Sequence, residues 1–197
     1  MAFGLDTAAA KAALRQRIIE NRRELDAQAL VEAAGALRDV AFAVPEIGGA
    51  RSVAAYVSVG SEPGTGPLLE SLSARGTEVL LPILLPDGDL DWAPYSGPHD
   101  LVPATRGMLE PVSEAMGPAA VTTVDAVLVP GLAVDQRGVR LGRGGGSFDR
   151  ALARVGGRVF TGVLLHDGEV LDMRIPRDPH DVPVDAAATP SGMRRFR

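Results

Sequence analysis

Three observations predict a single α/β domain of three layers, α/β/α, with a mostly parallel central sheet. Short apolar strand patterns alternate with helical patterns along the chain. Asp125 to Val129 is apolar at nearly every position after its first residue, which is typical of a strand covered on both faces. The 197 residues can bury one sizeable core. We therefore expect one domain over residues 1–197.

The N-terminal part of the chain predicts two helices. Asp6 or Thr7 is expected to cap a helix that runs to about Glu24, because residues 8–17 are rich in helix formers and contain neither proline nor glycine. A second helix is expected over about 27–43, where apolar residues recur at helical spacing.

The rest of the chain alternates between the two element types. Strands are expected over 52–59, 78–84, 90–95, 125–129 and 159–165, with a last extended segment over 184–188, and helices are expected over 67–75 and after the glycine run at 144–146. Residues 96–124 form a long connection rich in proline and glycine. A loop of this length inside a compact domain is commonly functional or poorly ordered.

Composition excludes several classes of protein. A formal net charge of −5 argues against a nucleic-acid partner, which needs broad positive potential. The absence of cysteine removes thiolate catalysis, cysteine-ligated zinc and disulfides. The N-terminus lacks a signal-peptide pattern, and no apolar run approaches the roughly 20 residues that span a bilayer. We expect a cytoplasmic monomer with no membrane or nucleic-acid partner.

Residues 138–154 carry the strongest chemical signal. Glycines let backbone N–H groups approach an anion, a helix N-terminus adds partial positive charge, and five arginines lie between positions 137 and 154 against one acid, Asp149. Asp149 offers an oxygen ligand to a divalent metal. Ser147 breaks a G-x-G-x-x-G pattern, and the only lysine, Lys11, is too far upstream for a P-loop.

Lys11 and Arg15 lie four residues apart on the first expected helix and therefore share a face. In a chain that otherwise uses arginine, the single lysine is consistent with a site that needs a compact ammonium group. A solvated helix face is the simpler alternative for this pair.

Five segments, in order, resemble the motifs of the 5-formyltetrahydrofolate cyclo-ligase family, also called 5,10-methenyltetrahydrofolate synthetase. They are Lys11-Ala-Ala-Leu-Arg15, Val57 to Thr65, Gly107-Met-Leu-Glu-Pro111, Asp125 to Arg150 and His180 to Asp185. The resemblance covers nearly the whole chain.

The resemblance implies an ATP- and magnesium-dependent ligase that converts 5-formyltetrahydrofolate to 5,10-methenyltetrahydrofolate and releases ADP and phosphate. In that reaction the formyl oxygen is phosphorylated and N10 of the folate then closes the ring. Such chemistry depends mostly on positioning and charge neutralisation, which cations, a metal site and backbone donors supply.

The resemblance also implies a role for each motif residue. Lys11 and Arg143 are the expected catalytic cations, and Asp149 and Asp181 the expected magnesium ligands. The nucleotide is expected to contact Lys11, Arg15, Arg140, Leu141, Gly142, Arg143, Gly144, Gly145, Gly146, Ser147 and Phe148. The folate is expected to contact Val57, Glu62, Gly144, Gly145, Gly146 and Ser147.

The chain departs from the family pattern at Ser147, where a tyrosine is common, and a serine there could instead cap the following helix. His99, His166 and His180 show no metal-ligand spacing and receive no role. Two other functions stay open: a different phosphate-handling α/β enzyme, such as a sugar-phosphate isomerase or CoA-transferase-like protein, and a folate- or nucleotide-binding protein without turnover.

Overall fold

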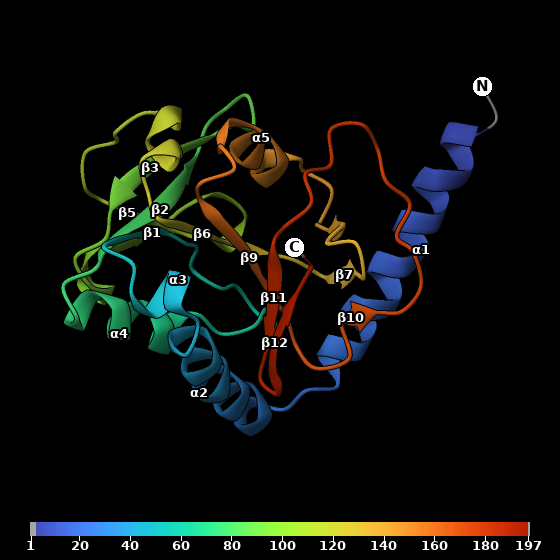
Figure 1. Ribbon diagram of the computed structural model, residues 1–197, viewed down its shortest axis with the longest axis horizontal. Coiled ribbons are helices and arrows are strands. Elements are labelled where there is room, and N and C mark those ends of the chain that lie inside the picture. Colours follow the sequence, from blue (N-terminus) through green and yellow to red (C-terminus); the bar gives the residue numbers. More distant parts are fainter. Residues whose placement is uncertain (1–2, 197) are drawn as a thin grey trace.

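The computed structural model describes the backbone of residues 3–196 and the side chains of residues 7–196 except 106. Helices and strands alternate along the chain, as expected from its sequence (Figure 1). The helices are α1 (Phe3–Arg23), α2 (Ala27–Phe42), α3 (Pro45–Gly48), α4 (Gly66–Ala74) and α5 (Ser147–Arg154), with 3-10 segments η1 (Pro98–Asp100), η2 (Thr105–Gly107) and η3 (Pro118–Thr122). The strands are β1 (Ser52–Ala54), β2 (Glu78–Leu84), β3 (Leu90–Pro94), β4 (Leu101–Pro103), β5 (Leu109–Pro111), β6 (Ala126–Pro130), β7 (Ala133–Asp135), β8 (Arg140–Leu141), β9 (Phe160–Leu164), β10 (Val170–Leu171), β11 (Ala186–Thr189) and β12 (Gly192–Arg195).

The central sheet has seven strands in the order β12-β11-β9-β6-β1-β2-β3. Its five inner strands pair in parallel, and β3 and β12 pair antiparallel at the two edges. The prediction of a mostly parallel sheet is therefore confirmed. The chain leaves β1 toward β2 on one side and leaves β6 toward β9 on the other, so the strand order reverses between β1 and β6. In open α/β sheets, ligands bind beyond the carboxyl ends of strands at such a point.

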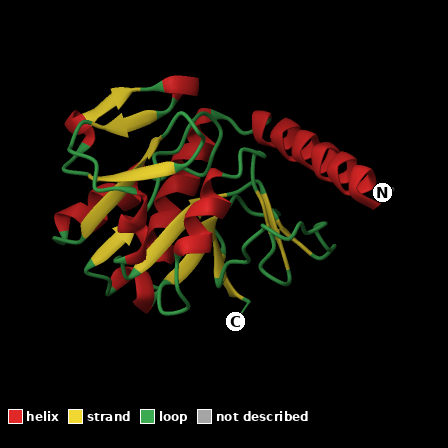
Figure 2. Ribbon diagram, turned by 90° about the horizontal axis from the view of Figure 1, so that it is seen from above, coloured by secondary structure: helices red, strands yellow, loops and turns green. Residues whose placement is uncertain are grey.

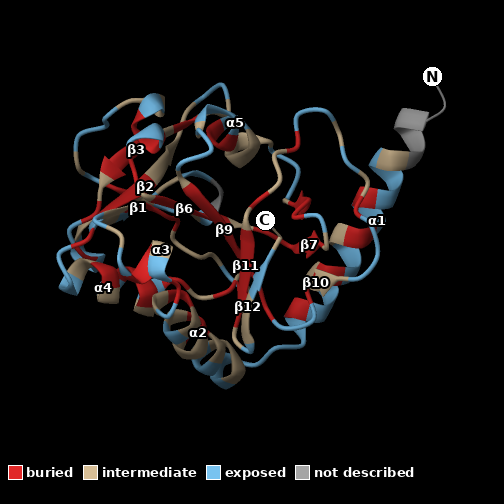
Figure 3. Cartoon of the chain, viewed as in Figure 1, coloured by how far each residue is buried: buried red, intermediate tan, exposed pale blue. Residues whose placement is uncertain are grey.

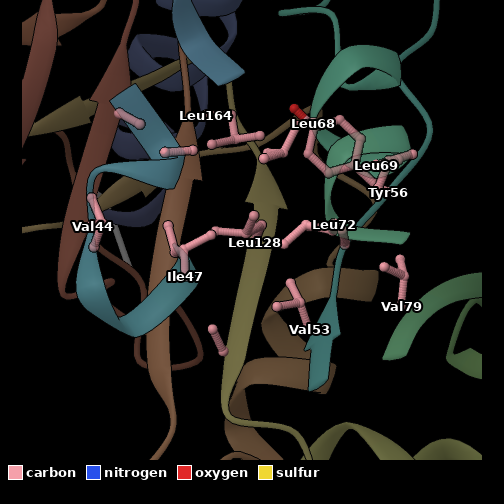
Figure 4. Packing of buried hydrophobic residues seen from close by; sticks show 14 of the residues in the cluster. Val44, Ile47, Val53, Tyr56, Leu68, Leu69, Leu72, Val79, Leu128 and Leu164 are labelled. Carbon is pink, nitrogen blue, oxygen red and sulfur yellow. The ribbon is translucent and has the colours of Figure 1, made fainter. Parts of the chain in front are cut away.

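Helices cover both faces of this sheet, which confirms the three-layer prediction. On one face, α2, α3 and α4 bury Leu37, Ile47 and Leu72 against strand residues that include Leu128, the cluster drawn in Figure 4. On the other face, α5 and η3 pack on the second half of the core. Figure 3 shows that buried residues run along the central strands, whereas exposed residues dominate the outer helix surfaces.

Helix α1 packs outside these layers, against a second sheet of strand order β10-β7-β8. Leu14 and Ile18 pack there with Leu132 and Leu141, and Figure 2 shows the N-terminal part of α1 projecting away from the central layers. Its C-terminal turn is fixed by Arg22, which is 2% exposed and makes two 2.7 Å hydrogen bonds to the Glu169 carboxylate. A charge buried this deeply must be paired.

Several expected boundaries were wrong for identifiable reasons. Helix α1 begins at Phe3, before both expected caps, and the side chain of Asp6 lies outside the described residues. The strand expected over 52–59 stops at Ala54, and the expected part at 58–59 lies outside the sheet, because the backbone N–H groups of Ser58 and Val59 donate to the side chains of Thr65 and Glu62.

The long connection over 96–124 is not structureless. It contains η1, η2 and η3 together with the antiparallel pair of β4 and β5, and its strand β5 lies close to β2 of the central sheet. The three-residue strands are too short for an alternating pattern to identify from sequence.

Asp135 holds the hairpin that leads into the glycine loop. Its carboxylate is 1% exposed and accepts from the backbone N–H groups of Arg137, Val139 and Ile175 at 2.8, 3.1 and 3.0 Å. Burial alone would raise the pKa of Asp135, but the Arg137 side chain and these backbone donors outweigh burial and hold the pKa below its ordinary value.

We expect Asp135→Asn to lower the free energy of unfolding at pH 7 by about 1–3 kcal/mol. Because the folded-state pKa is lowered, this stabilisation is complete above the unfolded pKa of about 3.9 and is lost as pH falls through the folded value. The difference between the two proteins in urea unfolding should therefore shrink below about pH 4. The exposed Glu24→Gln serves as the control, and a difference that stays constant to pH 2.5 would contradict the assignment.

Candidate functional site

A cavity of about 620 Å³ opens at the carboxyl ends of β1, β2 and β6. Every residue given a site role from the sequence lines it, although these residues span positions 11 to 181. They are Lys11, Arg15, Val57, Glu62, residues 140–149 and Asp181. The position of the cavity agrees with the reversal of strand order between β1 and β6.

Helix α1 supplies two cations to the cavity wall. The Arg15 Nε donates to the carbonyl of Gly142 at 2.9 Å and so joins the helix to the glycine loop. Lys11 is 6% exposed, and its Nζ lies 2.7 Å from Asp178 Oδ2 and 2.6 Å from Asp181 Oδ2. Burial would lower the pKa of Lys11, but the hydrogen bonds to these two carboxylates raise it, so the ammonium stays charged.

The glycine loop joins β8 to α5 and turns through two left-handed residues, Gly144 at φ +101° and Gly146 at φ +72°. Gly146 is the N-cap of α5, so the expectation that Ser147 caps this helix is wrong: Ser147 is the first helical residue. The positive φ of Gly146 is the reason, since a residue with a Cβ rarely adopts it. The first turn of α5 therefore lines the cavity.

Arg140 and Asp149 form an ion pair under the loop. The Arg140 guanidinium is 3% exposed; one terminal nitrogen lies 2.9 Å from Asp149 Oδ1 and the other donates to the Pro130 carbonyl at 3.0 Å. Its Nε is buried and has no hydrogen-bond partner among the described residues. A buried donor without a partner is costly, so this nitrogen is suited to an additional acceptor.

The opposite wall follows β1. Val57 and Tyr56 line it, and the Tyr56 ring meets Phe148 edge-on with centroids 6.4 Å apart. Burial raises the pKa of Tyr56, so its phenol is neutral. Glu62 lies beside them, accepts from the Val59 N–H at 2.9 Å through Oε2, and pairs with Arg143 Nε at 3.0 Å through Oε1.

The turn that carries Glu62 is held at several points. Ser58 and Thr65 exchange hydrogen bonds of 3.0 and 3.1 Å between backbone N–H groups and hydroxyls. Gly64 packs so closely on α2 that a Cβ would lie 2.7 Å from Ala34 Cβ. His166 Nε2 lies 3.1 Å from the Ser61 carbonyl oxygen. The turn is thus fixed by its own side chains, by α2 and by the end of β9.

The long connection contributes Met108, Leu109 and Glu110 to the cavity, and Glu110 Oε1 accepts from the Leu84 N–H at 3.0 Å. The motif over 107–111 resembles a motif of the family, but the sequence did not predict that these side chains face the cavity. Pairing of β5 with β4, and its packing near β2, brings them to the cavity.

Two further residues were missed by sequence reasoning. Asp178 and His180 lie with Asp181 so that one ligand atom from each falls within 4.8 Å of the others. Three possible metal ligands within four residues were the available signal in the sequence. Lys11, which pairs with the two aspartates, is 167 and 170 residues away. Burial would raise the pKa of Asp181, but the bond from Lys11 and the backbone N–H of Asp178 lower it. His180 is thus near candidate metal ligands, contrary to the expectation from spacing.

Known proteins share this chain's sequence over most of its length. The family model described as the 5-formyltetrahydrofolate cyclo-ligase family matches residues 7–190. The chain is 39% identical over 185 residues to the 5-formyltetrahydrofolate cyclo-ligase of Mycolicibacterium smegmatis, covering 91% of this chain and 93% of the relative. It is 32% identical over 150 residues to the Escherichia coli K12 protein of the same name, covering 75% and 82%.

Solved structures agree with the sequence relatives. The NMR structure of Aquifex aeolicus 5,10-methenyltetrahydrofolate synthetase is similar with a TM-score of 0.81 at 29% identity, covering 95% of this chain and 93% of that one. The Mycoplasma pneumoniae 5,10-methenyltetrahydrofolate synthetase has the same fold, with a TM-score of 0.71 at 20% identity over 91% and 98% of the two chains. Within residues 3–196, no helix has the length and apolar character that crossing a membrane requires.

We expect Gly64→Ala to destabilise the protein by about 1–3 kcal/mol, because the added methyl group would overlap the Ala34 side chain. Gly66→Ala is the matched control, since a Cβ at Gly66 meets nothing within 4 Å. Urea unfolding of both variants gives the measurement. Equal stability of the two would show that α2 does not restrain the turn.

Proposed function

This chain belongs to the 5-formyltetrahydrofolate cyclo-ligase family, and from that membership we propose that it converts 5-formyltetrahydrofolate to 5,10-methenyltetrahydrofolate in a reaction that consumes ATP and requires Mg²⁺. One observation carries the proposal: a single cavity joins a cationic glycine loop to a wall that bears the partly buried carboxylate of Glu62. The loop suits the phosphates of a nucleotide, and the carboxylate suits the N–H groups of a heterocycle.

The nucleotide end is proposed to be the part lined by α1 and the glycine loop. Lys11, Arg15, Arg140 and Arg143 surround it, and the glycines at 142 and 144–146 border it without side chains. A triphosphate takes hydrogen bonds from backbone N–H groups and from guanidinium groups. The buried Arg140 Nε, which lacks a protein partner among the described residues, supports an anionic ligand at this end.

The folate end is proposed to be the part lined by Val57, Glu62 and Ser147. A carboxylate that is only 11% exposed can accept from the N–H groups of a pterin, and a heterocycle without those donors would leave it unpaired. Arg143 Nε donates to Glu62 Oε1. Because the Arg143 side chain is 55% exposed, it can turn to the phosphates when nucleotide and folate bind.

Asp149 and Asp181 offer the oxygen ligands that magnesium prefers, and the ligand atoms that lie within 4.8 Å of one another are those of Asp178, His180 and Asp181. Asp149 and Asp181 line the same cavity, and Asp178 lies beside Asp181. When bound, the ion would neutralise negative charge on the phosphates. Lys11 forms an ion pair with Asp181, and Arg140 forms one with Asp149. Each proposed metal ligand therefore has a cationic side chain beside it, and its carboxylate would contact both that side chain and the ion.

The reaction needs positioning more than covalent help. The formyl oxygen attacks the γ-phosphorus of ATP, forming the new O–P bond as the bond to ADP breaks. N10 then attacks the formyl carbon, phosphate leaves with its oxygen, and the N10 proton is lost. Lys11 and Arg143, which line the cavity, are proposed to neutralise charge on the transferred group.

The other expectations from the sequence stay predictions. We propose that residues 1–197 act as one unit, as a cytoplasmic monomer with a small-molecule substrate. The net charge of −5 supports the absence of a nucleic-acid partner.

The decisive test is the absorbance of the methenyl product when 5-formyltetrahydrofolate, ATP and Mg²⁺ are mixed with the purified protein. Full signal with all components, and no signal without ATP, is expected. A phosphate-handling enzyme of another class would give no signal and would not bind the folate. A binding protein without turnover would bind both ligands and leave ATP intact.

Asp149→Asn should retain the fold and reduce turnover by about a hundredfold or more, because it removes the charge of a proposed metal ligand while nearly keeping its shape. Turnover is measured across a magnesium titration, with thermal unfolding as the check on the fold. Unchanged activity at limiting magnesium would contradict the metal assignment.

Lys11→Ala should weaken ATP binding about tenfold or more and affect folate binding less, because the ammonium lies at the proposed phosphate end. Calorimetric titration of each ligand gives the two affinities. Arg23→Ala, an exposed change on the same helix, is the control. Equal weakening of both ligands would indicate that Lys11 only holds α1 in place.

A further inference from the structure

We propose that His166 is a positioning residue for the folate: its ring N–H fixes the turn that presents Glu62 to the cavity. The inference rests on the proposed function of Glu62 and goes beyond it, because His166 itself does not line the cavity. It would act on substrate through the backbone of the neighbouring turn.

The contact joins the segments that follow β9 and β1, two parallel strands with β6 between them, at the carboxyl end of the sheet. His166 follows β9 after one residue, is 7% exposed, and places Nε2 3.1 Å from the Ser61 carbonyl oxygen, 105 positions earlier in the chain. A carbonyl oxygen only accepts, so this contact assigns the proton to Nε2. A buried, hydrogen-bonded imidazole is held in one orientation and can hold the carbonyl in turn.

The hydrogen bond to Ser61 restrains the backbone next to Glu62. Ser61 immediately precedes Glu62, whose carboxylate already uses Oε2 to accept from the Val59 N–H within the same turn. Other contacts of the turn come from its own residues, from Ala34 of α2 and from Arg143, which pairs with Glu62. His166 adds a restraint from β9, and binding groups must be held within about 0.5 Å to recognise a ligand well.

His166 is itself fixed by a buried ion pair. Its backbone N–H donates to Glu169 Oε2 at 2.8 Å, and the same carboxylate takes both hydrogen bonds from Arg22 of α1. Helix α1 also carries Lys11 and Arg15. The path from Arg22 through Glu169 and His166 to Ser61 therefore sets the proposed folate carboxylate relative to the helix that serves the nucleotide end.

The first experiment compares substitutions at His166 in the full-length protein. His166→Phe keeps a ring of similar size without the N–H, and His166→Gln keeps a donor of similar reach. Calorimetric titration with 5-formyltetrahydrofolate in the absence of ATP should show about tenfold weaker binding for His166→Phe, the size expected for one hydrogen bond. His166→Gln should restore most of that affinity. His99→Phe, at an exposed histidine, should change nothing.

Steady-state kinetics separates positioning from general damage. His166→Phe should raise the KM for the folate and leave the KM for ATP unchanged. His166→Asn, which is polar but too short to reach Ser61, should repeat this result and replaces the Phe variant if that one does not fold. Equal loss of both ligands, or no loss of folate affinity in either variant, would overturn the inference.

A double-mutant cycle with Glu62→Gln tests the route through Glu62. If His166 acts by positioning this carboxylate, the two effects should not add, and His166→Phe should change folate affinity little once Glu62 is replaced. Additive effects would overturn the inference while the proposed function stands. If Glu62→Gln alone left folate affinity unchanged, the proposed role of Glu62 would fail, and the inference would fall with it.

Discussion

The pairing of buried charge on α1 is the constraint on which the site depends. Lys11 and Arg22 are 6% and 2% exposed, and their partners, Asp178, Asp181 and Glu169, come from the last quarter of the chain. A buried cation without its partner costs several kcal/mol, roughly 3–5. Because the helix packs mainly on the small sheet, these ion pairs help fix its distance from the glycine loop, and so the width of the cavity's cationic end.

The same principle governs the interior of the cavity. Arg140 is paired with Asp149, Arg143 with Glu62, and Lys11 with Asp178 and Asp181. Opposite charges gathered around a cavity are stable without ligand because they neutralise one another. Under the proposed function, the phosphates, the divalent cation and the pterin would replace protein groups in these ion pairs. The side chains of the site are therefore paired before ligands bind, which lowers the desolvation cost of assembling the site.

The parts of the site that depend on neighbouring residues could be predicted from the sequence. Alternating helix and strand patterns indicated a parallel sheet between helices, and the glycine-arginine run indicated an anion loop, because both depend on residues close together in the chain. Glu62, Lys11, Arg15 and Asp181 were identified through their resemblance to family motifs, and all of them line one cavity. Short elements were missed, since β4 and β5 have three residues each and carry no periodicity.

Short-range patterns were enough to predict the fold class, the loop that faces the cavity and the residue types available for chemistry. The partners of the buried charged and polar side chains became known only from the folded structure. Lys11 reaches Asp181, His166 reaches Ser61, and Arg22 reaches Glu169 because strand order, register and the docking of α1 bring distant segments together. Contacts across a hundred or more residues leave no trace in local periodicity, so their partners could be named only after the packing was known.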